Sequence, residues 1–236
     1  MKRYVLKCVI FLGVALSMTG CATSQGFNRQ VLSTQIQEQE LDEVLALKPQ
    51  LSFPFKLAVY FNHPPEGSWS QQWQWRVQDK EILLAMEEEL QERRIISEMV
   101  VITGPEMTGT NLGAIRVAAA RHSADAVLVI TGIADIDDYN NLLAMTYVGL
   151  VTALFVPGSE IDALFMVNAI LWDVNNQFLY FAAEAEGTSH QMRPPILIRE
   201  SLAIENAKRR AVPLLYDELI KKMETLAEKY ASPSES

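Results

Sequence analysis

The stretch "ADAVLVITG", residues 124–132, decides the fold because it is apolar at every position from Ala126 to Ile130. A short, unbroken apolar run of this kind is typical of a strand that is covered on both faces, as in the centre of a parallel sheet. We therefore expect a central β-strand here, with covering elements on both sides of it in the sequence.

The residues before this strand alternate between strand and helix patterns. "KLAVYF" (56–61) and "EMVVIT" (98–103) predict two further strands, and residues 77–94 predict a helix. "TGTN" (108–111) supplies capping side chains for a second helix. Apolar side chains recur on one face of each helix: Leu83, Met86 and Leu90 in the first, and Leu112, Ile115 and Ala119 in the second.

The residues after the central strand change in character. "FMVNAILWDVNNQFLYFAAEAEG" (165–187) predicts a β-hairpin whose turn at Asn175-Asn176 tolerates positive φ. A long helical segment follows at 199–230, and Pro213 is expected to kink it or divide it into two helices. Together these patterns predict an α/β sandwich with a mixed sheet.

The stretch "NNLLAMTYVGLVTALFVPGSE" (140–160) is the most apolar part of the chain outside the N-terminus. Its uninterrupted apolar part, before Pro157, is shorter than the roughly 20 residues of a spanning helix. We expect an internal helix or strand that is covered by its own domain or by a neighbouring copy.

The N-terminus has the three parts of a secretory signal. "MKRYVLKCVIFLGVALSMTGC" (1–21) has a basic start, a short apolar run and small residues before Cys21. Its ending resembles the bacterial lipobox, with Met18 where Leu is usual. This resemblance implies cleavage between Gly20 and Cys21 and a membrane anchor of acyl chains on Cys21. The alternative is a secreted protein with an incidental cysteine.

Ala22, rather than Asp, follows the cysteine. In lipoproteins of diderm bacteria this resembles the pattern of proteins that pass to the outer membrane, so we expect an outer-membrane lipid anchor with the domain facing the periplasm. The chain then divides into a signal peptide (1–20), a lipidated tether (21–50), one α/β domain (51–230) and a short polar tail (231–236).

Charge and cysteine content exclude several function classes. Loss of the signal removes three of the 20 basic residues and none of the 29 acidic ones, so the formal charge of the mature chain is -12. This argues against a nucleic-acid partner and against electrostatic binding to anionic lipid. Cys8 leaves with the signal and Cys21 is lipidated, which excludes disulfides and thiolate chemistry.

Few residues have the spacing of a catalytic or metal site. His63, His122 and His190 do not have zinc-ligand spacing, and His122 is expected to cap helix carbonyls. "GPEMTGT" (104–110) lacks the lysine of a phosphate-binding loop. We expect no cofactor.

An acidic stretch follows the central strand. "ADIDDYNN" (134–141) gathers Asp135, Asp137 and Asp138, whose oxygen atoms are a weak candidate for calcium. A solvated acidic loop is the favoured interpretation.

Three tryptophans, Trp69, Trp73 and Trp75, lie just before the first predicted helix. Exposed tryptophans are frequent in binding surfaces, which makes them the best sequence-based candidate for a partner contact. Packing in the core, or as a lid over the sheet edge, is the favoured interpretation of this segment.

The whole pattern resembles a group of bacterial envelope lipoproteins. The resemblance depends on four features: the expected lipidated cysteine, the alternating elements up to "ADAVLVI", the "WDVNNQFLYFAAEAEG" hairpin and the closing helix. The domain of this group is similar to the N-terminal domain of TolB and to the periplasmic domain of the curli-secretion channel lipoprotein. "VGLVTALFVPGSEIDALFMVNAILWDV" (148–174) most resembles the rhombotarget lipoproteins. The resemblance implies no catalytic residue.

Three functions remain after these exclusions. The first is a non-enzymatic lipoprotein that binds other envelope proteins as an accessory or assembly factor. The second is a subunit of an oligomeric outer-membrane export pore, in which 142–174 would supply membrane hairpins. The third is an envelope hydrolase that uses Asp135, Asp137 and Asp138.

Overall fold

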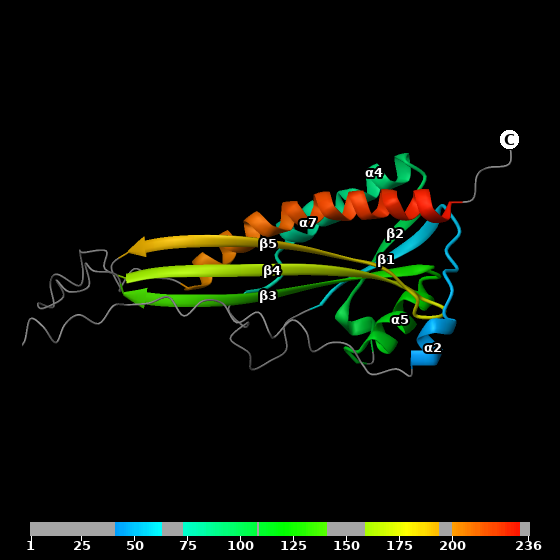
Figure 1. Ribbon diagram of the computed structural model, residues 1–236, viewed down its shortest axis with the longest axis horizontal. Helices are drawn as coiled ribbons and strands as arrows, with labels where there is room; N and C mark the ends of the chain where they lie inside the picture. Colours follow the sequence, from blue (N-terminus) through cyan, green and yellow to red (C-terminus); the bar gives the residue numbers. More distant parts are fainter. Residues whose placement is uncertain (1–40, 63–72, 108, 141–158, 194–199, 232–236) are drawn as a thin grey trace, which may run out of the picture.

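The apolar stretch 124–132 leads into the central strand of a five-stranded sheet in the computed structural model of the chain (Figure 1). The strand order is β2-β1-β3-β4-β5, and β3 (Ala126–Asn140) lies in the middle. The structure describes residues 41–62, 73–107, 109–140, 159–193 and 200–231. The sheet contains parallel and antiparallel pairs, which confirms the predicted α/β class with a mixed sheet.

The parallel half of the sheet consists of β1 (Phe55–Phe61), β2 (Ile96–Ile102) and the first part of β3. The chain reaches β2 through α3 (Val77–Leu84) and α4 (Met86–Glu92), and it reaches β3 through α5 (Leu112–Arg121). This is the predicted strand-helix-strand-helix-strand order, with a helix in each crossover.

The first predicted helix, 77–94, is divided into two helices that meet at Ala85. Leu83, Met86 and Leu90 are nevertheless all fully buried, as their common face predicted. The two short helices therefore bury one shared apolar stripe against the sheet.

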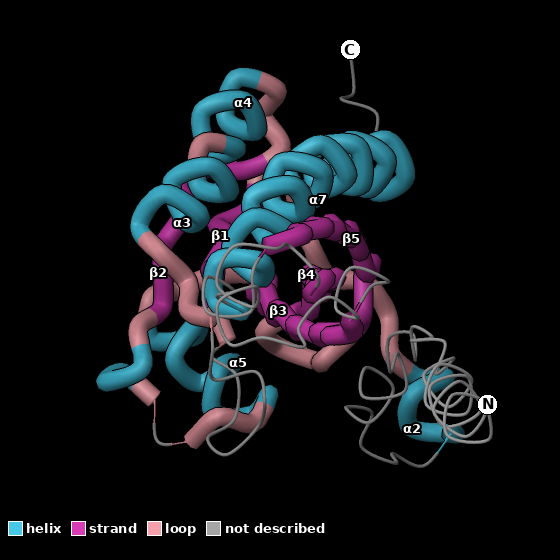
Figure 2. Tube along the Cα trace, turned by 90° about the vertical axis from the view of Figure 1, so that its left-hand side faces the viewer, coloured by secondary structure: helices cyan, strands magenta, loops and turns pink. Residues whose placement is uncertain are grey.

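Helices cover both faces of the sheet (Figure 2). α3, α4 and α7 (Glu200–Tyr230) contribute to the larger core on one face, and α5 contributes to a smaller core on the other. The side chain of Asn111, within the predicted cap, accepts a hydrogen bond from Ala114 N at 2.8 Å and begins α5.

The antiparallel half is a ribbon formed by β3, β4 (Ser159–Asp173) and β5 (Leu179–Arg193), each of 15 residues. Strands of this length span about 50 Å and extend well beyond β1 and β2 (Figure 1). Residues 134–140, predicted as an acidic loop, instead continue β3 and pair with β4. Polar and apolar residues alternate with the period of a strand from Ala134 to Asp137. Most of the apolar stretch at 140–160 (141–158) lies outside the described residues.

α7 is one continuous helix, which corrects the predicted break at Pro213. Proline removes the hydrogen bond to the carbonyl of Arg209, four residues earlier. Pro213 and Arg209 are both exposed, so water can replace the lost bond.

α7 approaches β5 closely at Gly187. A Cβ atom at this position would lie 2.7 Å from Ala211 N and still closer to Ala207 O. Ala203, Ala207 and Ala211 are fully buried on the facing side of the helix. Ser189 Oγ donates a hydrogen bond to Ala203 O at 2.8 Å. The absence of bulky side chains on both elements therefore sets the distance between α7 and the sheet.

Gly187→Ala is expected to lower the free energy of unfolding by about 2–3 kcal/mol, because the new methyl group would meet helix backbone that cannot move aside. Urea denaturation followed by circular dichroism measures the change. Gly104→Ala is the matched control, since nothing lies within 4 Å of a Cβ atom there. Equal denaturation midpoints for the two variants would show that the helix tolerates a wider spacing.

Candidate functional site

Two of the tryptophans predicted as a contact surface lie in the core. Trp73 and Trp75 are 3% and 7% exposed, and their perpendicular rings are 5.3 Å apart. Trp73 also packs on Phe165, with 4.8 Å between ring centroids. Gly132 makes room for it, because a Cβ atom there would lie 2.6 Å from the Trp73 ring. This placement agrees with the favoured core interpretation for both residues and not with a contact surface, and Trp69 lies outside the described residues.

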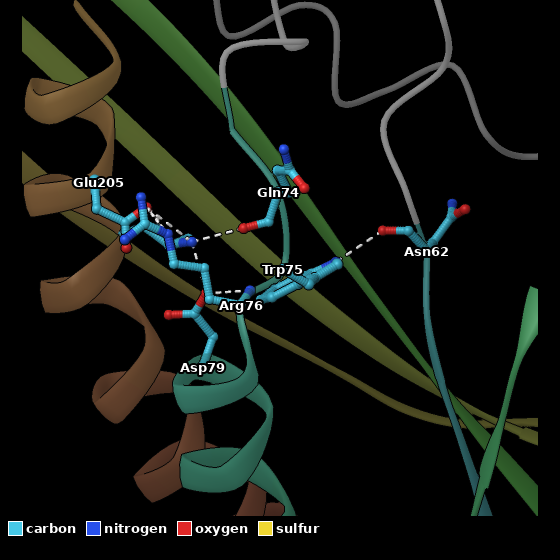
Figure 3. A network of polar contacts seen from close by, with 7 residues as sticks. Asn62, Gln74, Trp75, Arg76, Asp79 and Glu205 are labelled. Carbon is cyan, nitrogen blue, oxygen red and sulfur yellow. Dashed lines mark hydrogen bonds and ion pairs between the residues drawn. The ribbon is translucent and has the colours of Figure 1, made fainter. Parts of the chain in front are cut away.

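The segment that carries these tryptophans is fastened to α7 by a network of buried charges (Figure 3). Lys208 on α7 is completely buried. Its Nζ donates a hydrogen bond to Gln74 O at 2.7 Å, and it lies 2.6 Å from Asp79 Oδ2 and 3.1 Å from Glu205 Oε2. The three hydrogen atoms of the ammonium group therefore have three acceptors.

Arg76 completes the network. Its Nε lies 3.3 Å from Glu205 Oε2, and its backbone N–H donates to Asp79 Oδ2 at 2.9 Å. Trp75 Nε1 donates to Asn62 O at 2.8 Å beside it. Two cations face two carboxylates, so the network holds the start of α3 against α7 and its charges are engaged with one another.

Lys208→Met is expected to lower the free energy of unfolding by about 3–5 kcal/mol, because Asp79 and Glu205 would stay buried without the ammonium group. Urea denaturation measures the loss. The triple variant Lys208→Met/Asp79→Asn/Glu205→Gln should recover much of it, since it buries no unpaired carboxylate at these positions. A triple variant less stable than Lys208→Met would contradict this electrostatic explanation.

The three aspartates predicted as a weak cation site do not share a loop. Asp135 and Asp137 lie on one face of β3, and Asp138 follows in the same strand. Asp137 is 7% exposed and pairs across the sheet with Asp162, whose Oδ1 lies 2.6 Å from His190 Nδ1. Within the described ranges, no group of three His, Cys, Asp or Glu side chains is placed to hold a metal ion. These residues therefore belong to a strand and not to the acidic loop that the sequence predicted.

His122 ends α5 as predicted, but its ring contacts a carboxylate and not a helix carbonyl. Its Nε2 lies 2.7 Å from Glu106 Oε2, and Thr103 Oγ1 donates to the other oxygen of Glu106 at 2.6 Å. These hydrogen bonds, first that of Thr103 and then that of His122, lower the pKa of Glu106. The contact joins the turn before α5 to the end of that helix.

The end of the predicted tether is fastened to the β4–β5 turn. Tyr180 Oη accepts hydrogen bonds from Gln50 N at 2.9 Å and Leu51 N at 3.0 Å, and it donates to Asp173 Oδ2 at 2.6 Å. Asn176 Nδ2 donates to Lys48 O at 2.6 Å. The tether clamp consists of these residues: Lys48, Gln50, Leu51, Asp173, Asn176 and Tyr180. It begins just after α2 (Leu41–Ala46).

The turn inside the tether clamp is stiffened by its own polar side chains. Asp173 is 1% exposed, and its Oδ1 accepts hydrogen bonds from Asn175 N at 2.8 Å and Asn176 N at 3.2 Å. The hairpin is confirmed, but the positive φ of 65° falls on Gln177 and not on the two asparagines. Asn176 instead uses its side chain, which accepts from Phe178 N at 2.9 Å.

Burial raises the pKa of Tyr180 above its ordinary value, and the hydrogen bond to Asp173 adds to the increase. The hydroxyl group therefore stays protonated and continues to donate to Asp173 well into the alkaline range.

Tyr180→Phe is expected to destabilise the domain by about 2 kcal/mol, because it removes a hydrogen bond to a buried carboxylate and two from the tether. Hydrogen exchange should become faster at the amides of Gln50 and Leu51. Tyr230→Phe is the control, because its ring packs on Tyr180, with 6.1 Å between centroids, while the clamp bonds remain. Unchanged exchange at both amides would show that Tyr180 does not hold the tether.

The raised pKa of Tyr180 also predicts a pH dependence. Above about pH 10, tyrosine loses its proton in the unfolded chain before it does in the folded chain, so stability falls as the pH rises. Between pH 9 and pH 11, the Tyr180→Phe variant should lose less stability than the native chain. Parallel stability curves for the two proteins would contradict the assignment.

Among the described residues, no helix combines the length and apolar character needed to cross a membrane. No family model and no curated protein matches the chain, and the resemblance to rhombotarget lipoproteins therefore stays a prediction.

Similar solved structures include three bacterial proteins. Lipoprotein GNA1162 from Neisseria meningitidis has 13% identity and a TM-score of 0.30, covering 73% of this chain and 99% of that one. A PelC dodecamer from Paraburkholderia phytofirmans has 15% identity and a TM-score of 0.26, covering 71% and 93%. A neuraminyllactose-binding hemagglutinin homologue from Helicobacter pylori has 13% identity and a TM-score of 0.37, covering 75% and 91%. These values assign neither a family nor a function to this chain.

Proposed function

We propose that this chain is a lipid-anchored envelope protein of the outer membrane that acts by binding other envelope proteins, without catalysis. The sequence supports the anchor through the lipobox-like ending at Cys21. The tether clamp is the structural observation behind the proposal, because it binds the end of the predicted lipidated tether to a fixed place on the domain.

The position of the tether clamp fixes the point at which residues 48–51 meet the domain. The clamp lies at the end of the ribbon where β4 passes into β5, and the far ends of the 15-residue strands lie about 50 Å away. The chain from Cys21 to Lys48 can span at most roughly 90 Å. An anchored domain would therefore present the length of its ribbon to partners at an adjustable distance from the membrane.

The export-pore alternative loses part of its support. It required 142–174 to supply membrane hairpins, but 161–173 belongs to β4. Phe165, Val167 and Leu171 of this strand are fully buried in the core that includes α7. These side chains stabilise the domain itself and do not face lipid.

In-cell crosslinking of the affinity-tagged chain, followed by mass spectrometry, is expected to recover a defined set of envelope proteins with the membrane fraction. Cys21→Ser, expressed behind a secretory signal with its own cleavage site, should move the chain to the soluble fraction and lose those partners, because the acyl chains hold it at the membrane. Tyr230→Phe is the control, since it leaves the lipobox intact. A native chain that is soluble, or that crosslinks to no protein above the level of a tag-only control, would contradict the proposal.

A further inference from the structure

β5 is the outer strand on one side of the sheet. Within the described ranges it pairs with β4, and no strand pairs with its other side. Fifteen residues is long for an outer strand, and such a strand presents a row of backbone N–H and C=O groups that can pair with another chain.

One contact shows which backbone groups of β5 point outward. Arg210 Nη1 of α7 donates a hydrogen bond to Thr188 O at 2.6 Å, so this carbonyl points away from β4. In an antiparallel pair, residues that face the neighbouring strand alternate with residues that face away from it. The outward set is therefore even-numbered, and the side chains of its members are all exposed: Ala182, Glu184, Glu186, Thr188 and His190.

The two faces of the sheet offer different chemistry beside this edge. On the face opposite α7, Glu184 and Glu186 present carboxylates. On the α7 face, Arg210 reaches the edge, and Pro213 and Leu214 follow one turn later on the same side of the helix. Both are exposed, Leu214 by 53%. A strand added to β5 would meet acidic groups on one face and apolar groups on the other.

We propose that the β5 edge binds an extended segment of a partner protein in which basic and apolar residues alternate. Backbone hydrogen bonds to the outward groups of Ala182, Glu184 and Glu186 supply the pairing, while Thr188 O already accepts from Arg210. Alternate side chains of the segment meet the acidic and the apolar side. This inference rests on the proposed interaction role and names the surface that carries it.

A second copy of the chain complements this edge less well. Antiparallel pairing of β5 with β5 brings the glutamates of the two copies together. Pairing of β5 with β2 would bring Ile96–Ile102 to the edge, and the one acidic side chain there, Glu98, is already paired with Lys56 at 2.8 Å, so β2 offers no basic side chain to the glutamates of β5. Like charges on neighbouring strands destabilise a sheet.

The test uses the purified full chain with Cys21→Ser and a fluorescent heptapeptide of alternating lysine and valine, blocked at both ends. Fluorescence anisotropy should show saturable binding. Hydrogen exchange should slow at the amides of Glu184, Glu186 and Thr188, because their N–H groups become bonded.

Two variants separate pairing from charge. Glu184→Pro removes an outward N–H and leaves the ladder to β4 intact, so it should abolish binding. Glu184→Lys/Glu186→Lys should weaken binding by about tenfold or more through charge repulsion. The control Glu88→Lys/Glu92→Lys makes the same change of charge on exposed residues of α4 and should bind normally.

Several outcomes would overturn the inference: no saturable binding, full binding by Glu184→Pro, or an equal loss in the α4 control. If Glu184→Pro fails to fold, hydrogen exchange of the unsubstituted chain decides. Peptide binding that slows exchange elsewhere, and not on β5, would then overturn the inference. A dimer of the chain that Glu184→Pro abolishes would assign the edge to a second copy and overturn it as well. Envelope partners that crosslink unchanged to Glu184→Pro would leave the proposed function standing and remove β5 as its surface.

Discussion

The close approach of α7 to β5 at Gly187 is the constraint on which the rest of the domain depends. Because Ala203, Ala207 and Ala211 face a strand position without a side chain, the helix lies unusually near the sheet. Lys208, adjacent to Ala207, then reaches Gln74 and Asp79 on the opposite side of the helix from Arg210. A wider spacing would weaken the fastening of the Trp73–Trp75 segment and the contact of Arg210 with β5 together.

The parts of the fold that depend on local pattern could be predicted from the sequence. Five apolar residues in a row marked β3 as the central strand, and the spacing of Leu83, Met86 and Leu90 gave the buried face of α3 and α4. The extension of β3 was missed because its aspartates resemble a loop in composition, although they alternate with apolar residues. Pro213 was expected to break α7, but its exposed position allows the helix to continue.

The functional features depend on long-range contacts that leave little local signal. Lys208 lies in the polar sequence "ENAKRR" (205–210), where nothing distinguishes a buried ammonium group from an exposed one. Tyr180 and Gln50 are separated by 130 positions, and Asp162 and His190 by 28. The register of β4 and β5 would have been needed to bring Asp162 and His190 together, and the packing of the tether on the β4–β5 turn to bring Gln50 to Tyr180. The tryptophans show the same limit, since the composition of their segment fits a surface and a core equally well.

The place of α7 after all five strands also governs how the domain can form. Synthesis proceeds from the N-terminus, so the sheet is complete in sequence before the helix that covers one face of it has been made. Until Lys208 and the residues after it emerge, the apolar sides of Phe165, Val167 and Leu171 have no partner from α7. The 31 residues of α7 thus complete the cover of this face, and a chain truncated before Glu200 would leave these apolar side chains without that cover.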